Sequence, residues 1–264
     1  SPGGTPGTRS VVPWVETRAA RTKKGDVMQY DAIIIGGGPG GTAAARILAA
    51  GGKKVAVIEE QHWGGTCLNW GCIPTKLLLG AVAPKSQLHA LARQRLAGGE
   101  IVVDFAALRS RVSRFLKGSR QVLAKSLTEA GIDLRNGRGV CAGQGLVSFQ
   151  ADGKEELLQA DAVILAGGSR NAVFSGMAPD GEAVLDSTGA LALADVPESL
   201  IIVGAGAIGL ELGDFYAALG ARVTMVEAAP HIAPSEDPDI AAELERAITK
   251  AGRTCISGVK AVSL

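Results

Sequence analysis

The pattern of apolar and polar residues predicts an α/β chain from Tyr30 onward. The apolar run Ala32–Ile35 predicts a strand that leads into a glycine-rich turn, and an alanine-rich helix follows to about Ala50. A second apolar run, Lys54–Ile58, ends at an acidic residue. Strand, glycine turn, helix and strand together predict a βαβ unit, the building block of a parallel sheet.

The same construction is repeated near the end of the chain. A predicted strand at Leu200–Val203 leads into GAGAIG, a helix continues to about Leu219, and another strand follows at Arg222–Val226. A last helix is predicted over Pro238–Ala251. We therefore predict an α/β fold with one Rossmann-like domain and the first part of a second Rossmann-like domain.

The region between the two units is predicted to be helical first and β-rich afterwards. A helical stretch with polar breaks runs from about Pro74 to Ala130, and short β-like pieces lie around Val140–Phe149. The apolar run Ala162–Leu165 predicts a buried strand.

Three segments follow from this pattern. Residues 1–29 are rich in Gly, Pro, Ser and Thr and have no strand or helix period, so we predict a linker or a disordered tail. Asp195 and Pro197 mark a domain boundary. We place a first dinucleotide-binding domain over residues 30–195 and a partial second one over residues 196–264.

Composition directs attention to small-molecule chemistry. The net charge of the 264 residues is +1, which gives no electrostatic reason to expect nucleic acid or a membrane surface as a partner. No apolar run is long enough for a membrane span, and residues 1–29 lack the apolar core of a secretory signal. Four cysteines are too few for a disulfide scaffold. We therefore expect a cytoplasmic protein.

The first glycine turn has the spacing of a dinucleotide fingerprint. Gly36 allows the tight turn, Gly38 lets the backbone approach a pyrophosphate, and Gly41 permits close packing of helix and strand. The amino end of the helix supplies partial positive charge to the phosphates. Glu59, at the end of the next strand, is placed to accept hydrogen bonds from an adenosine ribose.

The second glycine turn repeats this fingerprint with Gly204, Gly206 and Gly209. Glu227 ends the following strand, and its carboxylate would repel a ribose 2′-phosphate. This site therefore favours NAD over NADP.

Two cysteines, Cys67 and Cys72, follow the first βαβ unit in the segment GGTCLNWGCIPTK. In an ideal helix their Cα atoms would lie about 8.6 Å apart, beyond the range of a disulfide. A bridge therefore requires a distorted turn, which Gly71 and Pro74 permit. Two ordinary buried thiols are the simpler alternative. Zinc binding is disfavoured because no second pair or histidines accompany them, and we expect no metal.

Three motifs together resemble those of dihydrolipoamide dehydrogenase and its relatives in the class I pyridine nucleotide–disulfide oxidoreductase family. They are GGGPGG, GGTCLNWGCIPTK and GAGAIGLELG, and the resemblance extends over residues 30–264. Within that family, CLNxGCIP and Ala207 look most like the lipoamide dehydrogenases. The resemblance implies FAD at the first fingerprint and NAD at the second.

The resemblance also implies roles for individual residues. Cys67 would be the thiol that exchanges with the substrate, and Cys72 the thiol that contacts the flavin. Lys76 would lie near the reactive flavin nitrogen, with Glu211 as its ion-pair partner. Further cofactor contacts implied by the family motifs are Gly65, Thr66, Lys76, Gly143 and Ser169 for FAD and Ile208 for NAD.

The family's activity would be oxidation of protein-bound dihydrolipoamide with NAD as hydride acceptor. The implied partner is the lipoyl domain of a 2-oxoacid dehydrogenase or glycine cleavage complex, and the full-length protein would be a homodimer. The resemblance further implies that residues 196–264 are only part of the NAD domain, so we expect an incomplete active site in this chain. Two alternatives stay open: another disulfide or mercuric reductase, and a non-catalytic FAD- or nucleotide-binding fragment.

Overall fold

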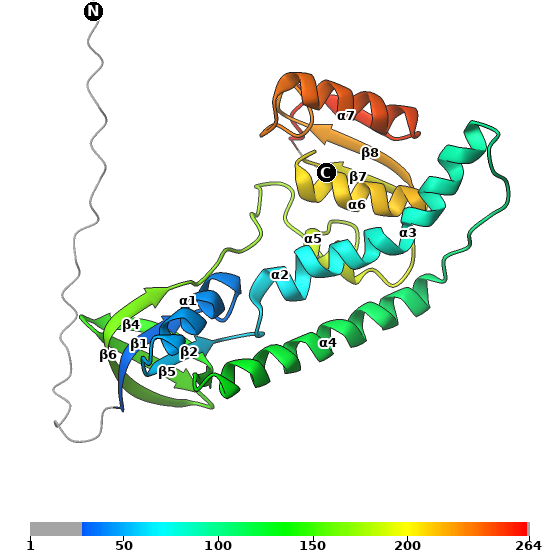
Figure 1. Cartoon of the computed structure of the whole chain (residues 1–264). Coiled ribbons are helices and arrows are strands. Elements are labelled where there is room, and N and C mark those ends of the chain that lie inside the picture. Colours follow the sequence, from blue (N-terminus) through cyan, green and yellow to red (C-terminus); the bar gives the residue numbers. More distant parts are fainter. Residues whose placement is uncertain (1–27, 263–264) are drawn as a thin grey trace, which may run out of the picture.

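A computed structural model describes residues 28–262 and contains two sheets joined by long helices (Figure 1). The predicted α/β fold is confirmed. Residues 1–27 of the predicted tail lie outside the described part of the chain. The first strand begins at Met28, so the last two residues assigned to the tail belong to the sheet.

The first sheet has six strands in the order β3-β2-β1-β6-β5-β4. Strands β1, β2, β3 and the end of β6 are parallel, whereas β4, β5 and β6 form an antiparallel meander. The predicted βαβ unit is present, with α1 between β1 and β2. Its elements are β1 (Met28–Ile35), α1 (Pro39–Ala50), β2 (Val55–Glu59), β3 (Asp133–Asn136), β4 (Arg138–Gly143), β5 (Leu146–Ala151) and β6 (Lys154–Leu165).

Alternate residues of β1 face opposite layers of this unit. Ile33 is fully buried against the meander, where it joins Phe149 and Leu158. Ile34 is fully buried on the other face, where α1 and the end of α4 supply Ala45 and Leu127. The strand is apolar at successive positions because both of its faces are covered.

The helical stretch between the two units starts earlier than the sequence predicted and contains two breaks. It consists of α2 (Gly65–Trp70), α3 (Cys72–Arg93) and α4 (Phe105–Glu129). The side chain of Asp104 caps α4 by accepting a hydrogen bond from Ala107 N at 2.9 Å. Figure 1 shows α3 running from the first sheet toward the helix α6 of the second sheet.

The second sheet has three parallel strands in the order β7-β8-β9. A short helix, α5 (Ser187–Ala192), precedes it. Its elements are β7 (Ser199–Val203), α6 (Ala207–Ala218), β8 (Arg222–Glu227), α7 (Pro238–Lys250) and β9 (Thr254–Ser257). The predicted repeat of the βαβ unit is therefore confirmed.

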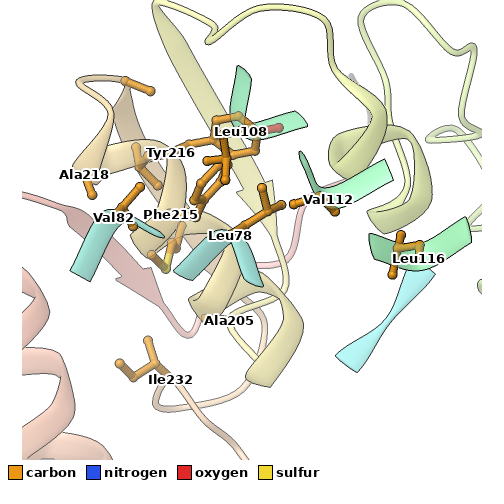
Figure 2. Close-up of a cluster of buried hydrophobic side chains, with 13 residues drawn as sticks. Leu78, Val82, Leu108, Val112, Leu116, Ala205, Phe215, Tyr216, Ala218 and Ile232 are labelled. Carbon is orange, nitrogen blue, oxygen red and sulfur yellow. The ribbon is translucent and has the colours of Figure 1, made fainter. Parts of the chain in front are cut away.

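An apolar cluster joins α3 and α4 to the second unit (Figure 2). Leu78 and Val82 of α3 are buried in it together with Phe215 and Tyr216 of α6. Leu108 and neighbouring residues of α4 close the cluster from the other side. Burial of these side chains removes apolar surface from water, which stabilises the contact between the two units.

The expectation of a buried strand at Ala162–Leu165 was wrong in two respects. The strand β6 is twelve residues long, and Ala162 and Leu165 are exposed, with Leu165 at 70%. Local hydrophobicity indicated a strand correctly but did not reveal which neighbours cover it. Across residues 28–262, no helix combines the length and the apolar character needed to cross a membrane.

Replacing Phe215 with alanine is expected to destabilise the chain by about 3–5 kcal/mol, because the ring is 1% exposed in the cluster between α3 and α6. Denaturation in urea, followed by circular dichroism, measures the change. Val122→Ala serves as the control, since Val122 is 69% exposed on α4. Equal effects of the two substitutions would contradict the assigned importance of this cluster.

Candidate functional site

At two of the three fingerprint positions of the first glycine turn, the packing leaves no room for a side chain. Gly36 has a φ of +114°, and a Cβ there would lie 2.1 Å from the Ala166 carbonyl oxygen. A Cβ on Gly41 would lie 1.9 Å from the carbonyl oxygen of Gly36. At Gly38 the nearest atom would be 3.8 Å away. Packing thus explains Gly36 and Gly41, whereas Gly38 leaves open backbone at the amino end of α1, which fits a bound pyrophosphate.

The Glu59 carboxylate, at the end of β2, accepts hydrogen bonds from the backbone of this turn and of the segment after β2. One oxygen accepts a hydrogen bond from Gly37 N at 2.7 Å, and the other accepts from Gln61 N at 2.8 Å and His62 N at 3.1 Å. The sequence predicted a ribose contact for Glu59, and this contact stays a prediction. Its observed partners show that the acid also orders the backbone around the turn.

The second glycine turn has the same construction. Gly204 has a φ of +100°, and a Cβ on Gly209 would lie 2.1 Å from the Gly204 carbonyl oxygen. A Cβ on Gly206 would have no atom within 4 Å. The carboxylate of Glu227 accepts hydrogen bonds from Ala205 N at 2.7 Å and Ala229 N at 2.8 Å. This turn therefore also fits a dinucleotide, with the side chain of Ile208 exposed in the first turn of α6.

The cysteine segment begins directly on the first glycine turn. Gly65 has a φ of +55°, and a Cβ there would lie 2.9 Å from Gly38 Cα. Gly64 N donates a hydrogen bond to the Gly37 carbonyl oxygen at 2.8 Å. Thr66 is exposed at the start of α2. The helix that carries Cys67 is therefore anchored to the proposed pyrophosphate site.

The two cysteines lie on different helices, because the helix is broken between them at Gly71. Helix α2 ends at Trp70 and α3 begins at Cys72. A Cβ on Gly71 would lie 2.9 Å from the Thr66 carbonyl oxygen, so the chain passes too close for a side chain. Pro74 lies in the first turn of α3, where its missing N–H costs no helical hydrogen bond. The turn between the cysteines is thus distorted, as a bridge between them would require.

Cys67 and Cys72 are free thiols on either side of the helix break. Cys67 is half-buried and Cys72 is exposed. The hydrogen bond to Cys72 is the main cause that raises the pKa of Cys67, and burial and the nearby Cys72 charge raise it further. The ammonium of Lys76 acts in the opposite direction. The net shift favours the thiol of Cys67 over its thiolate.

Lys76 and Glu211 form the ion pair that the resemblance implied. Lys76 Nζ lies 2.5 Å from one carboxylate oxygen of Glu211 and 2.7 Å from the other. Lys76 lies one helical turn after Cys72 on α3, and Glu211 lies on α6. The contact is confirmed, whereas the role of the pair toward a flavin stays a prediction.

Two residues of this site were missed by the sequence reasoning. Asn69 is 9% exposed, and its amide nitrogen donates to the carbonyl oxygens of Gly65 at 2.8 Å and Trp63 at 3.1 Å. Arg120 of α4 donates to the Asn69 side-chain oxygen at 2.8 Å. Asn69 stands inside the cysteine motif, so the motif offered a signal. Arg120 is one of six basic residues on α4, and no signal in the sequence distinguished it from the others.

The predicted contact of Gly143 with an adenine stays a prediction, and the structure places this residue at the end of strand β4. Strand β4 starts beside the end of β2, where Gly137 N donates to the Glu59 carbonyl oxygen at 2.8 Å. Gly143 ends the strand, roughly 20 Å further along at the usual rise per residue. Gly139 is closer to the end of β2. A Cβ on Gly139 would lie 3.1 Å from Ile58 and 3.2 Å from Ile35.

Ser169 is exposed in the segment that follows β6. This segment starts at the first glycine turn, because the Ala166 carbonyl oxygen is the atom that excludes a side chain at Gly36. The predicted FAD contact of Ser169 stays a prediction.

The chain is similar to curated dihydrolipoyl dehydrogenases. The chain is 39% identical over 240 residues to the dihydrolipoyl dehydrogenase of Chlorobaculum parvum, covering 88% of this chain and 50% of that protein. It is 36% identical over 227 residues to the dihydrolipoyl dehydrogenase of Trypanosoma brucei brucei, covering 84% and 47%. The chain thus spans about half the length of these relatives.

Two solved structures are also similar to this chain over about half of their own length. LpdA from Mycobacterium tuberculosis is similar with a TM-score of 0.79 at 28% identity, covering 90% of this chain and 52% of that one. The HOCl-induced flavoprotein disulfide reductase RclA from Escherichia coli is similar with a TM-score of 0.73 at 30% identity, covering 88% and 49%. The pattern that defines the pyridine nucleotide-disulphide oxidoreductases matches residues 30–263. The chain therefore belongs to the pyridine nucleotide-disulphide oxidoreductase family.

Proposed function

We propose that this chain is the part of a flavin-dependent oxidoreductase that carries its redox dithiol, Cys67 and Cys72, and its two dinucleotide sites. The observation that carries the proposal is the position of the two thiols. They lie on either side of a helix break, and their segment is packed on the first glycine turn. A dithiol in this position lies beside the cofactor of that turn.

FAD is the proposed ligand of the first turn and NAD of the second. Gly38 and Gly206 offer open backbone to a pyrophosphate, and Glu59 and Glu227 stand at the corresponding strand ends. Lys76 and Glu211 place a paired cation one turn beyond Cys72, where it would stabilise negative charge on a reduced flavin. When bound, the flavin supplies two-electron transfer between the dithiol and the nicotinamide.

The chemistry assigned to the cysteines is thiol–disulfide exchange. A substrate thiolate attacks the oxidised pair at the Cys67 sulfur, forms a mixed disulfide and releases the Cys72 thiolate. The second substrate thiol then attacks the mixed disulfide, releases Cys67 and leaves the substrate as a disulfide. Two electrons have moved from the substrate dithiol to the protein dithiol.

Dihydrolipoamide on a lipoyl domain is the proposed substrate, because the curated relatives reported above are dihydrolipoyl dehydrogenases. A homodimer and a 2-oxoacid dehydrogenase or glycine cleavage complex as partner belong to the same proposal. The second candidate, reduction of another disulfide, is favoured by the likeness to a flavoprotein disulfide reductase. A cytoplasmic location is also proposed, since a dithiol that cycles needs a reducing compartment.

The proposal is tested on this chain by mapping disulfides after oxidation with glutathione disulfide. We expect one intramolecular bridge, between Cys67 and Cys72, whereas the exposed Cys141 on β4 stays outside it. Peptide mass spectrometry under non-reducing conditions identifies the bridge, and Cys141→Ser is the matched control. Failure of Cys67 and Cys72 to bridge would overturn the proposal.

Gly38→Ala is expected to weaken FAD binding by at least about tenfold, or about 1.4 kcal/mol, without lowering stability. Gly38 has a φ of −75° and a ψ of −175°, which alanine adopts, so only the approach of the pyrophosphate is affected. Flavin fluorescence titration measures the affinity. Gly118→Ala on α4 is the control, because a Cβ there has no atom within 4 Å and Gly118 lies outside both glycine turns. Equal FAD affinity of both variants would contradict the assignment.

The raised pKa of Cys67 predicts slow alkylation at neutral pH, because iodoacetamide reacts with the thiolate. The rate should rise through a midpoint above that of an ordinary cysteine. Cys72→Ala removes the hydrogen bond and leaves the Lys76 charge, so the midpoint should move to lower pH. Mass spectrometry of the Cys67 peptide gives the rates, with Cys141→Ala as control. An unmoved midpoint in Cys72→Ala would refute the assigned cause.

A further inference from the structure

We infer that Arg120 is a positioning residue for the Cys67–Cys72 pair and that it acts through the side chain of Asn69. This inference deepens the proposed function and rests on it. Arg120 lies on α4, whereas Asn69 lies on α2 between the two cysteines. The hydrogen bond of 2.8 Å between them connects two elements that are 51 positions apart in sequence.

Both the nitrogen and the oxygen of the Asn69 side-chain amide form hydrogen bonds. Its nitrogen donates to the carbonyl oxygens of Gly65 and Trp63, which belong to α2 and to the turn before it. Its oxygen accepts from Arg120. With 9% exposure, Asn69 has little access to water that could replace these partners. The side chain therefore fastens α2 to the turn that precedes it.

Arg120 determines which way this amide points. A guanidinium only donates hydrogen bonds, so the amide oxygen must face Arg120 and the amide nitrogen must face the two carbonyl groups. A reversed amide would direct its oxygen at Gly65 and Trp63, where it would meet two acceptors. A hydrogen bond from a charged donor is stronger than a neutral one, which favours a single orientation.

The effect of Arg120 on the thiols is positional rather than electrostatic. The cation that lowers the pKa of Cys67 is Lys76, and Arg120 is not among the main causes of that shift. What Arg120 fixes is the placement of α2 and hence the distance between Cys67 and Cys72. Two thiols held close together form a disulfide more favourably, because their effective concentration is high.

The inference is tested on the full chain by equilibrating each variant with mixtures of reduced and oxidised glutathione. In this exchange the protein dithiol and one glutathione disulfide give the protein disulfide and two glutathione thiols. Acid quenching, alkylation and mass spectrometry give the oxidised fraction of the pair. Arg120→Ala is expected to shift the equilibrium toward the dithiol by about threefold to tenfold, the size of the net effect of one typical intramolecular hydrogen bond.

Two control variants separate this effect from loss of charge or of folding. Arg114→Ala removes an exposed arginine of the same helix and should leave the equilibrium unchanged. Arg120→Lys keeps one donor and should restore part of the shift. Thermal unfolding of all variants measures their stability. This measurement separates a shift of the glutathione equilibrium in the folded chain from a loss of folding.

Asn69→Asp keeps an acceptor for Arg120 but loses both donors to the carbonyl groups. It should shift the equilibrium in the same direction as Arg120→Ala, and the double variant should add little, because both residues act through one contact. If Arg120→Ala equals Arg114→Ala while the parent chain forms the bridge, the inference is overturned and the proposed function stands. If the parent chain forms no bridge, the proposed function itself fails.

Discussion

The packing of α3 against α6 is the contact on which the rest of the site depends. Leu78 and Val82 bury their side chains against Phe215 and Tyr216, so the two helices have a fixed relative position. Lys76 precedes Leu78 on α3 and thereby meets Glu211 of α6. Because α3 starts at Cys72, the same packing positions one of the two thiols relative to the second dinucleotide site.

The two units have the same local structure and different surroundings. In both, an acid at a strand end binds the backbone of the glycine turn, and the last fingerprint glycine packs on the first. Ile33 is fully buried beneath the meander, whereas Ile201, three residues before the corresponding first glycine, is 66% exposed. A glycine turn forms from its own sequence, but a sheet face is covered only by residues from elsewhere.

This difference explains which predictions from the sequence were correct. The βαβ units, the glycine positions and the break near Gly71 follow from local sterics, and all are present. The position of Gly143 depends on the direction of β4 across the sheet, which local sequence does not specify. Arg120 was missed because its partner is 51 positions away. The Lys76–Glu211 contact spans 135 positions and was anticipated only through the family resemblance.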